Sequence, residues 1–136
     1  MLSMAAQMVF LNLESMMVVH QGENSATEPE WRAFITELAG QDLSKLRVLI
    51  LTNGGGLTAE QRAELKATMA GRSVRTAVVS DSMKVRFIVA TIALINREHH
   101  CFTRAEIGKA YDFLELTATE RTETARAILE TGRLLA

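Results

Sequence analysis

Residues 46–61, LRVLILTNGGGLTAEQ, decide the fold that this sequence predicts. Four consecutive apolar residues, Val48 to Leu51, are typical of a strand whose two faces are both covered by helices. Gly54 to Gly56 follow and permit positive φ or a close approach of the backbone to another molecule. Thr58 and Gln61 have the spacing of a capping box at a helix start. Because ligands and partners dock at the carboxyl ends of strands in open α/β sheets, this turn is the first candidate site.

The rest of the chain continues this alternation of strands and helices. Apolar runs predict strands at 7–13, 15–20, 48–51, 74–79 and 99–102, of which the first two form an antiparallel hairpin. Apolar spacings of three and four, with Thr capping boxes, predict helices at 28–39, 58–70, 83–96, 103–114 and from 117 onward. The predicted fold class is α/β, with a single mixed sheet of about five strands covered by helices. One domain spans 1–136, with a core at about 7–116 and an additional C-terminal helix at 117–136.

The composition is that of an ordinary globular protein and excludes several function classes. The 136 residues are 48% hydrophobic and 23% charged, and the formal net charge is -1. Without a basic cluster, nucleic-acid binding lacks its main electrostatic term. The sequence has no uninterrupted run of about 20 apolar residues, so we expect no membrane span. The apolar N-terminus lacks a positive n-region and Cys101 is the lone cysteine, so the expected location is the cytoplasm.

Few side chains have the spacing that catalysis or metal binding requires. His99 and Cys101 share one face of a predicted strand, and His100 points to the other. A metal site needs a third or fourth ligand, and among the histidines only His20 remains. Cys101 has no evident base for nucleophilic work. We therefore predict no catalytic residues, no metal site and no cofactor.

The glycine turn and the helix starts are the remaining candidate sites. The backbone N–H groups of Gly54 to Gly56 and the next helix N-terminus attract anions, but the Lys and Ser/Thr of a P-loop are missing. Thr58, Ser80 and Ser82 lie at helix starts, where a phosphate would interact favourably with the helix dipole. Ordinary helix capping accounts for the same three residues.

The predicted helix at 83–96 is apolar around most of its circumference, more than one contact with a sheet requires. Either the C-terminal segment packs on its outer side or a second copy of the chain does. A homodimer would use Val85, Val89 and Ile92, and in a monomer the terminal helix must cover them. The same excess of apolar surface suits a small apolar ligand.

The element order resembles the STAS fold and, more narrowly, SpoIIAA-like STAS/SEC14-type proteins. The resemblance covers about Met8 to Leu116 and is carried by RVLILTNGGGLT, RTAVVSDSMKVRFIVATIALI and HHCFTRAEIGKAYDFL. It implies a regulatory protein of bacterial-type signalling. In STAS regulators that antagonise anti-sigma factors, a Ser or Thr in an Asp-x-Ser or Asp-Ser-Ser-Gly context is phosphorylated. Here TNGGGLTAEQ has neither motif, and only Thr58 lies at a comparable helix start.

Three functions follow from the residues and the resemblance. The first is a non-enzymatic regulatory or scaffolding module that binds a partner protein beside the glycine turn. The second is a carrier or sensor of a small apolar or lipid-like ligand, and the third is a homodimerising structural module. The residues expected to bind the partner are Asn53, Gly54, Gly55, Gly56, Thr58, Ser80, Asp81, Ser82 and Lys84, with Thr58 also a phosphorylation candidate.

Overall fold

A single five-stranded sheet forms the centre of the protein. The computed structural model describes residues 6–14, 16–93 and 96–135, apart from the side chain of Thr91. The strands are β1 (Met8–Asn12), β2 (Met16–Gln21), β3 (Arg47–Thr52), β4 (Arg75–Val79) and β5 (His99–Phe102). Their order is β1-β2-β3-β4-β5, with β1 antiparallel to β2 and all other neighbours parallel. The predicted mixed α/β sheet is confirmed, while the predicted strand start at Ser15 lies outside the described residues.

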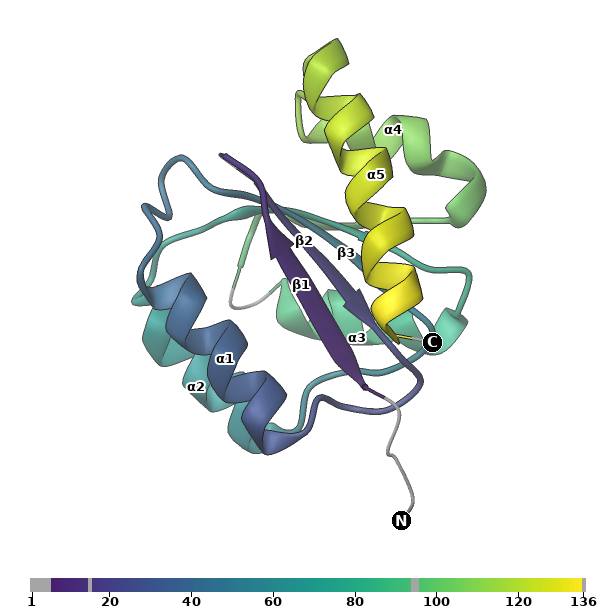
Figure 1. Ribbon diagram of the computed structural model, residues 1–136. Helices are drawn as coiled ribbons and strands as arrows, with labels where there is room; N and C mark the ends of the chain where they lie inside the picture. Colours follow the sequence, from purple (N-terminus) through teal and green to yellow (C-terminus); the bar gives the residue numbers. More distant parts are fainter. Residues whose placement is uncertain (1–5, 15, 94–95, 136) are drawn as a thin grey trace.

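The helices are divided between the two faces of this sheet. They are α1 (Glu28–Ala39), α2 (Ala59–Met69), α3 (Met83–Ile92), α4 (Ile107–Phe113) and α5 (Ala118–Leu135), with a 3-10 turn, η1 (Arg104–Glu106), before α4. Because the strands follow one another in chain order and parallel crossovers are right-handed, α1, α2 and α3 lie on the same face. Figure 1 shows α4 and α5 on the opposite face. We call these the α1–α3 face and the α4–α5 face.

The predicted capping boxes place the helix starts. The boxes at Thr27, Thr58 and Thr117 form with both hydrogen bonds and precede α1, α2 and α5. At Thr103 the box precedes η1, so α4 begins later than predicted, at Ile107. Each box satisfies backbone N–H groups that would otherwise lack partners at a helix end.

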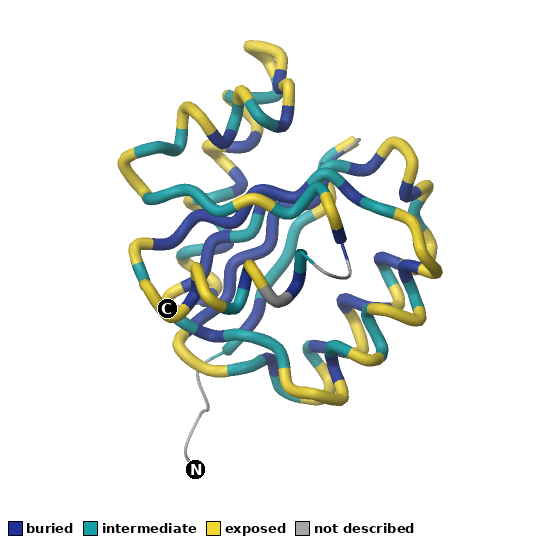
Figure 2. The backbone as a smooth tube through the Cα atoms, turned by 180° about the vertical axis from the view of Figure 1, so that it is seen from behind, coloured by how far each residue is buried: buried dark blue, intermediate teal, exposed yellow. Residues whose placement is uncertain are grey.

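The α4–α5 face is closely packed. Val18, Leu49, Ala77 and Leu114 are fully buried there, and α5 packs on β1 and β2. Figure 2 shows the strands mostly buried and the helices exposed on their outer sides.

α5 contacts the sheet through small side chains, a pattern that the sequence prediction missed. Thr124, Ala127 and Thr131 are buried, and the Nδ1 atom of His20 lies 3.2 Å from Thr131 Oγ1. Of the other apolar residues of α5, Ile128 is half-buried and packs against the same core, whereas Ala125 is exposed and Leu129 is 73% exposed. Small residues at these positions let the backbone of α5 approach the strands closely.

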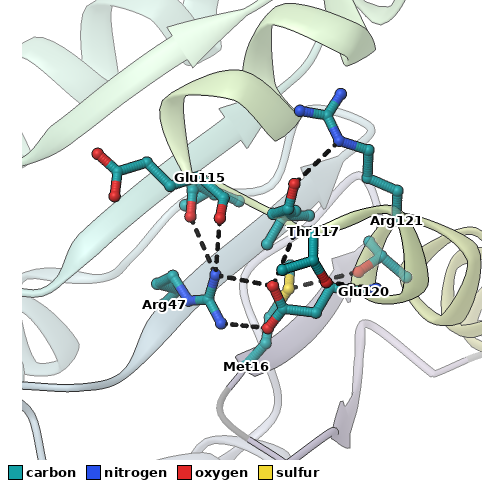
Figure 3. Close-up of polar contacts among 9 residues, drawn as sticks. Met16, Arg47, Glu115, Thr117, Glu120 and Arg121 are labelled. Carbon is teal, nitrogen blue, oxygen red and sulfur yellow. Dashed lines mark hydrogen bonds and ion pairs between the residues drawn. The ribbon is translucent and has the colours of Figure 1, made fainter.

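Arg47 connects β3 to the junction between α4 and α5 (Figure 3). Its Nη1 atom donates to the carbonyl oxygens of Leu114 at 3.2 Å and Glu115 at 3.4 Å. The same guanidinium forms an ion pair with Glu120 through both carboxylate oxygens. Hydrogen bonding from Arg47 and from the Thr117 backbone lowers the pKa of Glu120 to about 2. This cluster, the Arg47 clamp, holds the start of α5 against the sheet.

Candidate functional site

The α1–α3 face contains a partly open cavity of about 100 Å³. α1 and α2 pack against each other, α3 packs on β5, and the cavity lies between these two groups above β3 and β4. Its wall contains no Asp, Glu, Lys or Arg among the residues that the structure describes. The apolar side chains that line it most directly from the sheet, α2 and α3 are Val48, Ile50, Val78, Leu65, Met69, Val85, Ile88, Val89 and Ile92.

Short side chains explain why this face is not filled. Val78 of β4 and Val85 and Val89 of α3 are buried and meet across the layer, but each ends one carbon beyond its branch. Gly56 has no side chain at all, and a Cβ atom there would lie 2.8 Å from Ile88 Cδ1. These short valines leave part of the layer between α3 and the strands unfilled, whereas Ile88 occupies the space beside Gly56.

One end of the cavity is polar, and most of its groups have partners. Asn96 accepts from the Val74 N–H at 3.0 Å, and its amide donates to the Val74 carbonyl at 2.7 Å and to Thr76 Oγ1 at 3.2 Å. His99 lies beside Thr76 on the neighbouring strand and also lines the cavity. Within the described part of the chain, His99 Nδ1 is a buried atom with no hydrogen-bond partner. Burial, with a smaller effect of His100, lowers the pKa of His99 to about 4, so the imidazole is neutral at pH 7.

The strand 99–102 presents its residues to alternate faces, as predicted. Cys101 packs against Val78, and His99 lines the cavity on the same face of the sheet. His100 points to the other face, where its ring lies 4.6 Å from that of Phe113. Burial raises the pKa of the Cys101 thiol, so this cysteine is a poor nucleophile at neutral pH.

The glycine turn after β3 is held by its own chain. The N–H groups of Asn53, Gly54 and Gly55 donate to the Gln21 carbonyl, Thr52 Oγ1 and the Gly22 carbonyl, at 3.0, 3.2 and 2.9 Å. These three donors are consequently not directed at an anion. The close approach that the glycines suggested occurs within the protein itself.

Two glycines of this turn are required for different reasons. Gly54 has a φ of 128°, which residues with a side chain rarely adopt. Gly55 is buried, and a Cβ atom there would lie 2.3 Å from the Asn24 carbonyl oxygen. The turn is thus built to fit against the loop that follows β2.

The structure separates the nine predicted partner-binding residues by exposure. Gly55 and Ser80 are buried and cannot contact a partner, and Ser80 is only 1% exposed. The half-buried residues are Gly54, Gly56 and Ser82, and the exposed residues are Asn53, Thr58, Asp81 and Lys84. The Thr58 hydroxyl is occupied as a cap, because it accepts from the Gln61 N–H at 3.1 Å.

Arg104, which sequence reasoning did not single out, joins two of the exposed residues. Its guanidinium donates to Asn53 Oδ1 at 2.6 Å, and its backbone N–H donates to Asp81 Oδ1 at 2.9 Å. Arg104 thereby connects the loops after β3, β4 and β5. Its position at the end of the last strand, across from Asn53 and Asp81, was the available signal.

The buried and exposed sides of α3 differ from those that the sequence predicted. Val85, Val89 and Ile92 are 2%, 7% and 4% exposed, so the fold buries the three residues predicted as a homodimer contact. α5 does not cover them, because it lies on the α4–α5 face. The outer side of α3 carries instead Met83 and Phe87, which are 75% and 78% exposed.

The C-terminal end of this helix also differs from the prediction. α3 ends at Ile92, four residues before the predicted end at Asn96. The Asn96 N–H still donates to the Ile92 carbonyl at 2.9 Å, and the Asn96 side chain bonds the backbone of Val74. The predicted helical positions Leu94 and Ile95 lie outside the described residues.

The rule for ligand sites in open α/β sheets does not select a loop in this fold. That rule places ligands where the strand order reverses, and here the order follows the chain from β1 to β5 without reversal. The cavity, between a helix layer and the sheet, is therefore the candidate site that the geometry itself provides.

No helix in the described ranges is long and apolar enough to cross a membrane. Comparison with protein-family models and with curated proteins gave no match to this sequence. The resemblance to STAS domains stays a prediction that rests on the three stretches quoted for it.

Proposed function

We propose that this protein is a non-catalytic carrier or sensor that holds a small apolar ligand in the cavity on its α1–α3 face. The observation that carries the proposal is a void of about 100 Å³ with a wall free of charged side chains in the part of the chain that is described. An apolar cavity of roughly 150 Å³ in another protein binds benzene, so the available volume suits a molecule of a few carbon atoms.

Packing energetics favour an occupant. Protein interiors are close-packed, and atoms that line a void lose their attractive contacts on one side. Val78, Val85 and Val89 line this void, and a bound apolar molecule restores those contacts. Water is a poor substitute, because it needs two to four polar partners and most polar groups of the wall are already bonded.

Methyl NMR with benzene as the probe tests the proposal. We expect saturable shifts of the methyl groups of Val78, Val85, Ile88 and Val89, which line the cavity. The methyl groups of Val79, on the α4–α5 face, provide the control within the same strand. Val78→Ile, which adds a methyl group toward the cavity, should weaken the binding.

Shifts that do not saturate, or that are equally large at Val79, would contradict the proposal. Native mass spectrometry of protein purified without added ligand extends the test to natural occupants. A bound small molecule that is depleted in Val78→Ile would identify the chemical class that the cavity holds in cells.

Protein binding through the outer side of α3 is a second candidate function. Met83 and Phe87 are exposed one helical turn apart, beside the predicted partner-binding residues Asp81 and Lys84. Exposed apolar residues grouped in this way are typical of interaction surfaces.

A matched pair of variants tests this second function. A stoichiometric partner recovered with the wild-type protein should be lost with Phe87→Asp. It should be retained with Leu129→Asp, since Leu129 is similarly exposed on α5. Gly55 is unsuitable for such a test, because any side chain there collides with the Asn24 carbonyl. A partner that is indifferent to Phe87→Asp would exclude this surface.

A further inference from the structure

A polar cleft lies at the carboxyl ends of β2 and β3, beside the end of α5. It is open to solvent and measures about 320 Å³, and Figure 1 shows the C-terminal end of α5 beside the end of β2. A closed cavity of roughly 150 Å³ in another protein holds benzene, so this cleft has room for a six-membered ring with substituents. The polar side chains that line it in the described part of the chain, none of them Lys or Arg, are those of Gln7, His20, Glu23, Asn24 and Asn53.

The imidazole of His20 presents a hydrogen-bond acceptor to this cleft. Its Nδ1 atom lies 3.2 Å from Thr131 Oγ1, and Thr131 donates its single hydroxyl proton to the Ala127 carbonyl at 2.9 Å. Thr131 Oγ1 therefore accepts from the Nδ1–H of His20, and the neutral ring keeps its lone pair on Nε2. His20 is 8% exposed and lines the cleft. Its Nε2 atom, unlike His99 Nδ1, is accessible to solvent and has no partner among the described residues.

Asn53 presents a hydrogen-bond donor to the same cleft. Its Oδ1 atom accepts from Arg104 Nη2 at 2.6 Å, and an arginine can only donate, so the other arm of the amide is the NH₂ group. His20 is paired with Leu51 in the sheet, and Asn53 follows two residues later on the same face, where it lines the cleft. Thr131 and Arg104 thus fix one acceptor and one donor on neighbouring strand ends.

Gly132 of α5 leaves the cleft open above the His20 ring. Its φ is not positive, so the backbone does not require glycine there, and alanine has the higher helix propensity. A Cβ atom at this position would meet only the imidazole, at 3.6 Å from Cε1 and 3.9 Å from Nδ1. The missing side chain therefore exposes the histidine at the expense of helix stability.

We propose that this cleft binds a small neutral molecule with several hydroxyl groups, a sugar or a polyol, through His20 Nε2 and Asn53 Nδ2. A hydroxyl group both donates and accepts, so one such molecule satisfies both atoms. An anion would face the Nε2 lone pair and the Glu23 carboxylate. Burial and the charge of Arg104 lower the pKa of His20, and the same positive charge disfavours a cation. The cleft and the apolar cavity of the α1–α3 face are separate sites, so this inference is independent of the proposed function.

NMR of the ¹⁵N-labelled histidine rings tests the assignment in the wild-type protein. The free protein should show His20 protonated at Nδ1 and not at Nε2. The probes are D-glucose, D-ribose and myo-inositol at millimolar concentration, and at least one should shift the His20 Nε2 resonance saturably. Tetrahydropyran, which is the ring of glucose without its hydroxyl groups, should not. The His99 resonances are the control, because its ring lines the cavity on the other face.

Two isosteric or minimal variants locate the contacts. Asn53→Asp keeps the oxygen that bonds Arg104 and replaces the donor by an acceptor, so the affinity for the sugar should fall about tenfold. Gly132→Ala places a methyl group against the His20 ring and should also weaken binding. Gly108→Ala is its control, because the added carbon in α4 has no neighbour within 4 Å. Both alanines raise helix propensity, so a loss confined to Gly132→Ala does not arise from unfolding.

Each contrary result overturns a stated part of the proposal. A His20 ring protonated at Nε2 would remove the acceptor, and the absence of a saturable shift with all three probes would remove the site. Sugar binding that is unchanged in both Asn53→Asp and Gly132→Ala would place the sugar elsewhere on the protein. Equal shifts with tetrahydropyran would show that the cleft does not recognise hydroxyl groups. None of these results bears on benzene binding in the apolar cavity, so the two proposals fail separately.

Discussion

The two faces of the sheet are built from neighbouring residues but differ in how completely they are filled. Val78 and Val79 are adjacent in β4, yet Val78 lines a cavity and Val79 belongs to the packed core of the α4–α5 face. The packed face is held by the Arg47 clamp and by close contact of α5 with the strands. Both faces bury apolar clusters, Trp31, Phe34 and Leu38 on the α1–α3 face and Leu49 and Leu114 on the α4–α5 face, so the difference lies in the open space between α3 and the strands.

Side-chain size accounts for this difference. On the α4–α5 face, the small residues Thr124, Ala127 and Thr131 of α5 are buried against the strands. On the α1–α3 face, the large side chains of α1 are buried, and short residues meet only where β4 faces α3. The bulkier Met83 and Phe87 of α3 are exposed.

The largest expected loss of stability follows from shortening a buried side chain on the α4–α5 face. Leu49→Ala should lower the free energy of unfolding by about 3–5 kcal/mol, because Leu49 is fully buried and its loss leaves a cavity. Ile50→Ala, at the next position, should cost about 2 kcal/mol, because Ile50 is half-buried and borders space that is already open. Urea unfolding followed by circular dichroism measures both values. Equal losses would contradict the difference between the faces.

The second effect is a pH dependence that originates at the cavity. His99 has a pKa of about 4 in the folded protein and about 6.5 when unfolded. The unfolded chain therefore binds the extra proton between these values, so the free energy of unfolding should decrease as pH falls from 6.5 to 4. The decrease attributable to His99 should be about 3 kcal/mol.

His99→Leu should remove this decrease, and urea titrations at a series of pH values measure it. His100→Leu retains the buried imidazole and should retain the effect. If the pH profile of His99→Leu matches that of the wild type, the acid sensitivity arises from groups outside the cavity.

The sequence was sufficient for the parts of the fold that depend on local patterns. Apolar runs located all five strands, and Thr27 and Thr58 marked helix starts, because capping and strand burial are set by a few neighbouring residues. The buried face of α5 was not predicted, since helix propensity and apolar spacing do not report that Thr124 and Thr131 approach a sheet.

The cavity could not be predicted for a related reason. Its volume depends on how far apart α2 and α3 lie, which is set by the summed lengths of side chains from distant parts of the chain. The glycine turn looked like a binding loop because Gly55 needs a close backbone neighbour. Only the three-dimensional arrangement shows that this neighbour is Asn24.

A third prediction inserts one methyl group on each face. Val79→Ile should lower the free energy of unfolding by about 1–3 kcal/mol, because Val79 is 1% exposed in a filled core and the added carbon overpacks it. Val78→Ile should change stability by less than about 1 kcal/mol, since its added carbon enters the cavity. Thermal unfolding of the two variants in parallel gives the comparison, and a larger loss for Val78→Ile would show that the cavity is not available space.

The smallest expected loss of stability follows from breaking the ion pair of the Arg47 clamp. Glu120 has a pKa of about 2 in the folded protein against an ordinary value of 4.5, chiefly because Arg47 bonds its ionised form. This contribution is present above pH 4.5 and is lost as pH falls toward 2. The pair is partly exposed to solvent, so Glu120→Gln should cost about 1 kcal/mol at pH 7 and less in high salt.

Glu120→Gln should leave the benzene affinity unchanged, because the clamp and the cavity are on opposite faces. A change in benzene binding that parallels the loss of stability would mean that the two faces act as one unit.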